Sequence, residues 1–341
     1  MFDRRSVFDR RSVLTAAASF WLAAGISPSV HAADAPLEAV ASFSIIGDIV
    51  AEIGGDRVNV TTLVGPDGDA HVFEPTPADV KKLGDAAILF ENGLAFESWL
   101  DRLAKASNFK GPRVVVSEGV KVRPAGNGHD DEHEHAKDDH SKKDHDHDHK
   151  HDHAGHDHAG HHHGSEDPHA WQNVANAVIY ARNVATALEQ RDPAHAADYK
   201  ARAADYIARL EALDARLKQQ FAAIPENRRK IVTSHDAFGY FGDAYGLTFI
   251  APKGISTEAE ASATDVARLI DQIRAEGITA VFVENIANAK LIEQIAAETG
   301  AKIGGRLYSD ALAKPGQPAS TYIGLIERNA NEIAGALTPA R

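Results

Sequence analysis

The stretch DPAHAADYKARAADYIARLEALDARLKQQFA (Asp192–Ala222) decides the fold. Asp192 followed by Pro193 is a typical helix start, with aspartate as N-cap and proline at the first helical position. Apolar side chains then recur every three or four residues, at Tyr199, Ala203, Tyr206, Leu210, Leu213, Leu217 and Phe221. This period predicts a helix with one buried face. About 28 residues at roughly 1.5 Å each would span roughly 42 Å, more than one small domain. We therefore expect a rigid connection between two domains, with a long surface helix as the alternative.

Short β-rich runs alternate with helical stretches on both sides of this helix. The expected strands are 38–42, 58–64, 86–90 and 113–116 before it, and 230–233, 248–251, 278–283 and 302–307 after it. Such alternation predicts parallel sheets with helices on their faces. The expected fold class is α/β, with two similar parallel-sheet lobes joined by one long helix. The expected limits are 33–190 for the first lobe, 191–224 for the connecting helix and 225–341 for the second lobe.

The N-terminus resembles an export signal. Four arginines precede an apolar stretch of 14 residues, 13–26, which is too short to span a membrane. Small residues around His31 predict cleavage near Ala32, so residues 1–32 are read as a signal peptide and the mature protein is expected in the periplasm. The sextet FDRRSV occurs twice, at Phe2 and Phe8. A twin-arginine signal is therefore an alternative to an ordinary secretory signal.

Composition restricts the possible partners and ligands. A net charge of −13 argues against nucleic acid and anionic membrane surfaces as partners. The chain contains no cysteine. Disulfides, thiolate metal sites, cysteine nucleophiles and a lipid-bearing cysteine are thereby excluded, and any bound metal must be held by nitrogen and oxygen atoms.

Residues 129–163 have the composition of a metal-binding loop. Fourteen of these 35 residues are histidine and eleven are aspartate or glutamate. So few apolar side chains cannot offset the entropy of ordering, which predicts a disordered loop within the first lobe. Imidazoles beside carboxylates bind Zn²⁺, Cu²⁺ or Ni²⁺ near neutral pH. The alternative is a solvated acidic spacer.

Four further residues follow strands or precede helices. His71 follows the second strand, His169 stands just before a helix, and His235 and Asp310 follow strands of the second half. Ligands of parallel α/β sheets bind outside the carboxyl ends of the strands. We therefore expect each half to contribute two side chains to a metal site in the cleft between the lobes. The alternative for each histidine is an ordinary surface or hydrogen-bonded residue.

Three imidazoles and one carboxylate suit tetrahedral Zn²⁺. Four protein ligands leave no position for a catalytic water, so binding is favoured over hydrolysis and no enzyme activity is expected. The sequence also lacks the HExxH, P-loop and GxSxG motifs. A zinc hydrolase is the alternative, and it would need Glu74 or Glu284 as general base. The strand-end rule places Glu284 near the same site.

The segments HVFEPTP, DPHAW, SHDAF and LYSDAL, around His71, His169, His235 and Asp310, resemble the ligand motifs of ZnuA-like zinc-binding proteins. These belong to the metal-ion family, cluster A-I, of ABC-transporter solute-binding proteins. The resemblance covers nearly the whole chain after the signal and implies that these four residues are the metal ligands. Manganese-type members tend to carry a carboxylate at the third position. His235 therefore favours zinc, as does the preference of manganese for oxygen ligands.

The resemblance implies a function as well as a fold. The expected protein is a monomeric periplasmic binder that delivers Zn²⁺ to a membrane ABC permease driven by its ATPase. A periplasmic metal buffer or chaperone without a transporter is one alternative, and a manganese-type binding protein is another.

Overall fold

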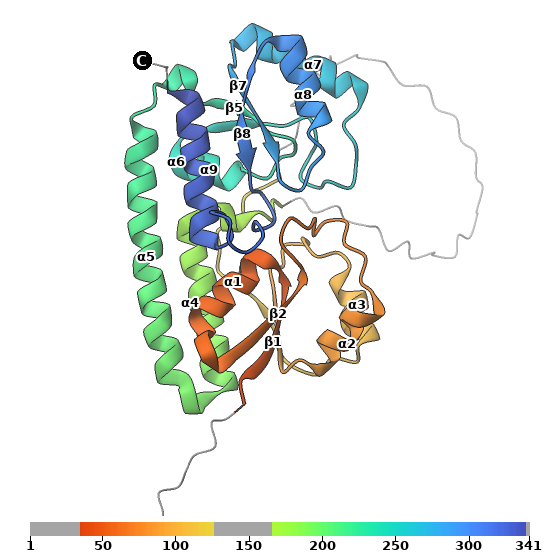
Figure 1. The fold of residues 1–341 in the computed structure, drawn as a ribbon, viewed down its shortest axis with the longest axis vertical. Coiled ribbons are helices and arrows are strands. Elements are labelled where there is room, and N and C mark those ends of the chain that lie inside the picture. Colours follow the sequence, from red (N-terminus) through yellow and green to blue (C-terminus); the bar gives the residue numbers. More distant parts are fainter. Residues whose placement is uncertain (1–34, 126–165, 339–341) are drawn as a thin grey trace, which may run out of the picture. The chain divides into compact units, whose positions relative to one another are not determined.

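The computed structural model describes residues 35–125 and 166–338. The predicted signal peptide 1–32 and the histidine-rich segment 129–163 lie outside the described residues. Residues 36–341 form one compact unit, within which the described segments build two α/β lobes (Figure 1). None of the described helices has an apolar run long enough to cross a membrane.

The first lobe is built around a parallel sheet with the strand order β2-β1-β3-β4. Its elements are β1 (Leu37–Phe43), α1 (Ser44–Gly54), η1 (Gly55–Arg57), β2 (Val58–Val64), α2 (Pro77–Asp85), β3 (Ile88–Glu91), α3 (Leu100–Ala106) and β4 (Arg113–Val115). Leu37 lies opposite Val58 and Ala39 opposite Ile88. The last five residues of β1 are all buried, as expected of a central parallel strand covered on both faces.

The second lobe repeats this topology, with the strand order β6-β5-β7-β8 and parallel pairing throughout. Its elements are η4 (Glu226–Arg228), β5 (Lys230–Val232), α6 (Gly239–Tyr245), β6 (Thr248–Ile250), α7 (Ala263–Glu276), β7 (Ala280–Glu284), α8 (Lys290–Thr299), β8 (Lys302–Leu307) and α9 (Tyr322–Leu337). The predicted fold class of two similar parallel-sheet lobes is therefore confirmed.

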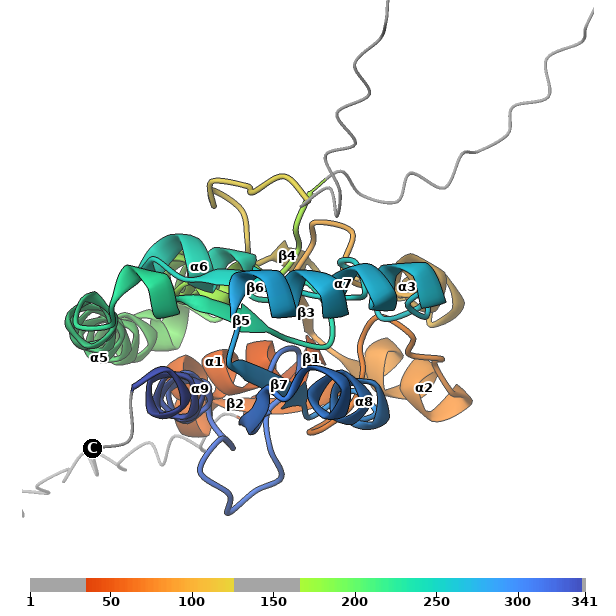
Figure 2. The same ribbon diagram turned by 90° about the horizontal axis from the view of Figure 1, so that it is seen from above.

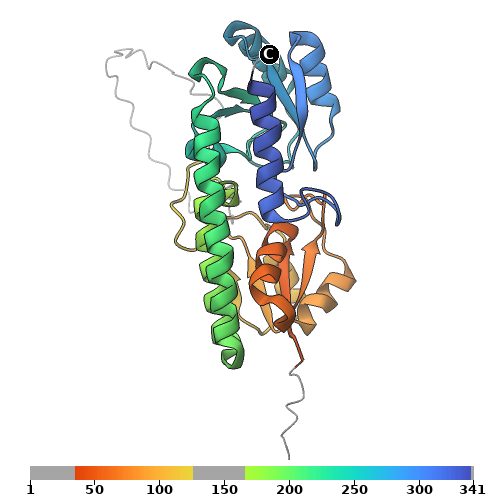
Figure 3. The same ribbon diagram turned by 60° about the vertical axis from the view of Figure 1, so that its left-hand side comes forward.

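Helical segments connect the two sheets. They are η2 (Ala170–Gln172), α4 (Val174–Arg191), η3 (Pro193–His195) and α5 (Ala196–Ala222). The buried positions of α5 are the seven apolar residues that the sequence pattern indicated. Figure 3 shows α5 running beside both lobes, so the predicted long connecting helix is confirmed. Burying each large apolar side chain of this face contributes roughly 1.5–3 kcal/mol.

The start of the long helix differs from the prediction. Residues Pro193–His195 form a 3-10 turn, and the α-helix begins at Ala196. Asp192 does not cap the α-helix through backbone N–H groups. Its Oδ2 accepts instead from the Tyr199 hydroxyl at 2.6 Å and lies 2.8 Å from Nδ1 of His195. His195 is therefore a half-buried partner of Asp192.

One helix was missed in the sequence. Helix α2 begins at Pro77 behind a capping box, in which Thr76 and Asp79 satisfy each other's backbone N–H groups. The Oδ2 atom of Asp79 accepts from the Thr76 backbone N–H at 2.9 Å. The local pattern TPAD carried this signal, because threonine as N-cap, proline at N1 and aspartate at N3 are a helix start.

The second lobe packs around two separate cores. One face of its sheet, with Phe282 of β7, joins a large core that continues through α9, α5 and α4 into the first lobe. The other face, with Val281, packs on α7 and α8 in a smaller core. Figure 2, which looks down on the second lobe, shows α8 and α9 on opposite sides of β7. The core on one face of the second-lobe sheet is therefore continuous with the core of the first lobe, whereas the core on the other face is separate.

Candidate metal centre

His71 lies in the loop between β2 and α2. Its backbone N–H donates to Oδ1 of Asp69 at 2.9 Å, and the preceding carbonyl, of Ala70, accepts from Nε1 of the buried Trp99 at 2.8 Å. The ring of Phe96 meets the imidazole edge-on, with centroids 4.7 Å apart. These contacts fix the loop at both the backbone and the ring, and they leave the His71 side chain 5% exposed.

His169 comes directly before the 3-10 turn η2. Oδ1 of Asp167 accepts the backbone N–H of His169 at 3.0 Å and lies 2.8 Å from the ring atom Nδ1. Both side chains are fully buried. With Nδ1 engaged by a carboxylate, Nε2 is the atom left to bind a metal.

His235 follows β5, and Glu284 ends the neighbouring strand β7. Oε1 of Glu284 accepts the backbone N–H groups of Ser234 and His235 at 2.7 and 2.9 Å. Its Oε2 lies 2.6 Å from Nδ1 of His235. The position near the site that the strand-end rule predicted for Glu284 is therefore confirmed.

Asp310 follows β8 and is tied to the first lobe. The carbonyl of the preceding Ser309 accepts two buried donors, Nε1 of Trp171 at 3.0 Å and Nε2 of Gln172 at 2.7 Å. Trp171 and Gln172 stand just after His169 in the chain. Two hydrogen bonds therefore join the segment that follows His169 in the first lobe to the residue that precedes Asp310 in the second lobe.

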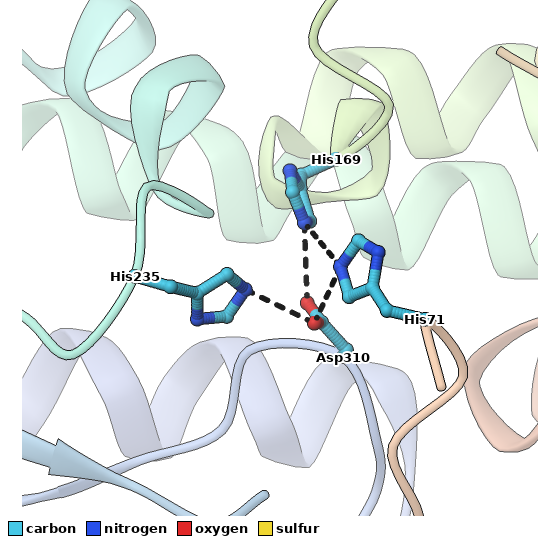
Figure 4. A group of neighbouring side chains, drawn as sticks. All are labelled: His71, His169, His235 and Asp310. Atoms are coloured by element: carbon cyan, nitrogen blue, oxygen red, sulfur yellow. Dashed lines mark hydrogen bonds and ion pairs between the residues drawn. The ribbon is translucent and has the colours of Figure 1, made fainter. Parts of the chain in front are cut away.

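The structure brings His71, His169, His235 and Asp310 together between the lobes, with their four ligand atoms within 4.8 Å of one another. His71 Nε2 lies 3.3 Å from Asp310 Oδ2 and 3.3 Å from His169 Nε2. The other contacts to Asp310 are 3.1 Å from His235 Nε2 and 3.7 Å from His169 Nε2. Figure 4 shows three imidazoles converging on one carboxylate. Oδ1 of Asp310 is buried and accepts no hydrogen bond from the described residues, which suits a metal ligand.

Burial and neighbouring charges shift the pKa values of three of the candidate ligands in different ways. Burial lowers the pKa of His71, although the Asp310 carboxylate opposes this. Burial would also lower the pKa of His235, but the carboxylates of Glu284 and Asp310 raise it well above its usual value. Burial would raise the pKa of Asp310, and His235 and His169 lower it instead. Neighbouring carboxylates thus favour the protonated form of His235, and neighbouring imidazoles favour the ionised form of Asp310.

The sequence motifs did not point to two aspartates beside the candidate ligands. Asp69 and Asp167 each stand two residues before a histidine and accept that histidine's backbone N–H. The repeated spacing D-x-H, in DAH and DPH, was the available signal, because an aspartate side chain commonly bonds the backbone two residues on. Glu74, the other candidate base, is exposed, and the cluster does not include it.

Two α/β lobes with a buried site of three histidines and one aspartate between them define a metal-binding protein. Comparison with known proteins agrees with this class. The profile of the ZnuA family, described as the periplasmic component A of a zinc-uptake complex, matches residues 39–336. The chain belongs to this family. It is therefore an exported, metal-binding protein of the ABC-transporter substrate-binding class.

Of two similar relatives, one is named for metal in general and the other for iron. The metal ABC transporter substrate-binding lipoprotein FimA of Streptococcus parasanguinis is 31% identical over 325 residues, covering 94% of this chain and 95% of FimA. The iron ABC transporter substrate-binding lipoprotein MtsA of Streptococcus pyogenes serotype M1 is 31% identical over 307 residues, covering 88% of this chain and 89% of MtsA.

Solved structures share the fold at similar identity. The periplasmic zinc-binding protein TroA of Treponema pallidum superposes with a TM-score of 0.75 at 28% identity, covering 89% of this chain and all of TroA. A manganese-bound periplasmic metal-binding protein of Candidatus Liberibacter asiaticus gives a TM-score of 0.71, also at 28% identity and with the same coverage. The fold and family are therefore common to proteins that hold different metals.

Proposed function

We propose that this protein binds one Zn²⁺ ion through His71, His169, His235 and Asp310 in the periplasm. It then delivers the ion, as a monomer, to a membrane ABC permease driven by its ATPase. The observation that carries the proposal is the convergence of three imidazole nitrogens and one carboxylate on one buried point. Such a donor set suits Zn²⁺.

The distances between the donor atoms support zinc. A tetrahedral site with bonds of about 2.0–2.1 Å has ligand-to-ligand edges of about 3.3–3.4 Å. Three of the six separations, those from Asp310 Oδ2 to His71 and His235 and that between His71 and His169, are 3.1 to 3.3 Å, close to these edges. All four donor atoms lie within 4.8 Å of one another, so an ion at the centre would draw the more distant donors inward.

The donor atoms of the site also favour zinc over manganese. Imidazole nitrogen is a borderline-soft donor that zinc accepts readily, whereas manganese prefers sites rich in oxygen. Here nitrogen outnumbers carboxylate three to one, counting one ligand atom from each residue. The manganese-bound structural neighbour keeps a manganese-type binding protein as the second candidate.

Burial supports a role in holding an ion rather than in catalysis. The side chains of His169 and Asp310 are 0% exposed, and that of His235 is 1% exposed. Glu284, the remaining candidate base, is occupied with three contacts to the His235 segment. A hydrolase would instead need a free base and an open metal position.

Calorimetry tests the binding half of the proposal. The mature protein, with and without residues 129–163, is titrated with Zn²⁺ and with Mn²⁺. We expect one tight zinc site that survives the deletion, is lost in His71→Ala and is strongly weakened in Asp310→Ala. Loss of the tight site on deletion of the segment would favour a metal buffer. Tighter binding of Mn²⁺ than of Zn²⁺ would favour the second candidate.

Delivery needs a separate experiment. We expect the zinc-loaded protein, but not His71→Ala incubated with the same amount of zinc, to stimulate the ATPase of its permease in proteoliposomes. A protein that binds zinc tightly but leaves every candidate permease unstimulated would be a buffer or chaperone.

A further inference from the structure

Arg123 is a half-buried residue that connects the two lobes behind the metal centre. Its Nη1 lies 3.2 Å from Oδ2 of Asp167, and its Nε lies 3.1 Å from Oδ2 of Asp243 in α6. The side chain of Arg123 is 26% exposed and that of Asp167 is 0% exposed. A buried carboxylate is costly unless it is paired, and Arg123 supplies the positive charge.

Asp167 uses its two oxygens for different partners. Oδ1 holds the backbone and ring nitrogens of His169 at 3.0 and 2.8 Å, and Oδ2 faces the guanidinium of Arg123. The arginine and the histidine together therefore determine how this carboxylate is rotated. A change at Arg123 reaches the ring of His169 through one intervening side chain.

The backbone of Arg123 strengthens the connection. Its N–H donates to the Tyr240 hydroxyl at 2.8 Å, and its carbonyl accepts the Asp167 N–H at 2.9 Å. The same Tyr240 hydroxyl donates to the Asp167 carbonyl at 3.1 Å. The guanidinium also lies against Gly239, where an added Cβ would fall 2.3 Å from Nη1. The first turn of α6, which follows His235 by four residues, is thus built to accommodate this arginine.

We propose that Arg123 is a positioning residue for metal binding. It holds Asp167 so that His169 presents Nε2 to the ion, and it fixes the His169 segment to the helix that follows His235. Arg123 does not contact the ion. The inference rests on the proposed function, because it assigns Arg123 a part in the affinity of that same site.

The change Arg123→Gln tests the inference. Loss of a group that orients a metal ligand typically costs 10–100-fold in affinity, and for this more distant residue we expect about tenfold. The affinity of the mature protein for Zn²⁺ is measured by competition with a chelator of known affinity. The matched control is Arg113→Gln, because Arg113 also pairs with two carboxylates, Glu91 and Asp101, and is 37% exposed.

A double-mutant cycle tests the route through Asp167. If Arg123 acts through this carboxylate, Asp167→Asn combined with Arg123→Gln should bind zinc no more weakly than Asp167→Asn alone. Additive losses would overturn the inference, and so would wild-type affinity in Arg123→Gln. A general loss of stability would not produce such non-additivity at one metal site.

Arg123→Lys covers the case in which Arg123→Gln fails to fold. Lysine keeps the charge but not the fork that reaches both carboxylates, so we expect a several-fold loss of affinity compared with Arg113→Lys. Equal affinities in these two variants would overturn the inference. If the wild type lacked a tight site sensitive to His71→Ala, the proposed function itself would be wrong. If the wild type has that site and the Arg123 variants bind zinc as tightly as the wild type, the proposed function stands. Only the inference about Arg123 is then wrong.

Discussion

Oε2 of Glu284 lies 2.6 Å from Nδ1 of His235, and Oε1 of the same carboxylate accepts the backbone N–H of His235. Asp167 holds His169 through the same two groups, with one oxygen serving both. Each lobe therefore supplies a buried carboxylate that fixes the rotation of a histidine. The two carboxylates also bear on how tightly the proposed site holds its ion, because such partners set the orientation and basicity of the ring.

Replacing Glu284 by glutamine should weaken zinc binding by about 10–100-fold. The amide keeps the shape of the side chain but loses the charge that favours the His235 ring N–H. Chelator competition measures the affinity. Glu276→Gln, in the same lobe, is the control, because Glu276 forms an exposed pair with Lys230. Unchanged affinity in Glu284→Gln would mean that packing alone orients His235.

Zinc binding should release a proton and weaken as the pH falls. Burial opposes a proton on His235, but the carboxylates of Glu284 and Asp310 raise the pKa of this ring well above its usual value, so we expect it to bind a proton at neutral pH when no ion is bound. A metal needs the neutral ring, so the bound proton must leave, and affinity should fall about tenfold for each pH unit below that pKa. Burial lowers the pKa of His71, so this ring is already neutral and releases no proton at pH 7.

Calorimetry in buffers of different ionisation enthalpy counts the released protons. We expect about one at pH 7, and fewer in Glu284→Gln, in which the pKa of His235 is less elevated. An affinity that stays flat from pH 7 to pH 5 would contradict a site built on three histidines.

Thr257→Val should speed the release of zinc. The Thr257 hydroxyl, in the loop after β6, donates to Oδ2 of Asp69 at 2.6 Å, and Oδ1 of Asp69 holds the backbone of His71. Valine keeps the shape but removes the donor, so the His71 loop loses one of its contacts with the second lobe and keeps those of Asp67 with Leu312 and Asn285. We expect the dissociation rate, followed after addition of excess chelator, to rise several-fold.

The control for this change is Thr264→Val on the exposed start of α7. A rate for Thr257→Val equal to that of the control would show that this contact does not limit release.

Asp48→Asn should stabilise the metal-free protein at alkaline pH. Asp48 accepts the Tyr322 N–H at the start of α9 at 2.8 Å. Burial, reinforced by Glu52 and opposed by this N–H and by Arg209, raises its pKa from 3.8 to about 6. The folded state thus binds the proton more tightly, and the free energy of unfolding falls as the pH rises from about 4 to 6.

Asparagine keeps the acceptor without the charge. Urea unfolding should therefore show Asp48→Asn more stable than the wild type by about 2–3 kcal/mol at pH 8 and nearly equal at pH 4. The exposed Asp205→Asn serves as control. A destabilised Asp48→Asn at pH 8 would mean that the Asp48 charge favours the α9 N-terminus more than burial penalises it.

The fold class and the four candidate metal-binding residues were predictable from the amino-acid sequence. The apolar side chains from Tyr199 to Phe221 recur with the helical period of 3.6 residues, so the buried face of this helix could be predicted without the structure. The position of His71, His235 and Asp310 after strands placed them at one edge of each sheet. Helix α2 was also readable from its capping box, although the sequence analysis missed it.

The contacts that join the two lobes were not predictable from the sequence. Trp171 and Gln172 donate to the Ser309 carbonyl across more than 130 residues, and Arg123 reaches Asp243 across 120. Periodicity and motifs depend on residues that are close in the sequence. These contacts depend instead on how the sheets and helices of the two lobes pack against one another. The pKa shifts of His235 and Asp310 were not predictable from the sequence either. Each shift depends on burial and on charged neighbours that tertiary packing brings next to the residue.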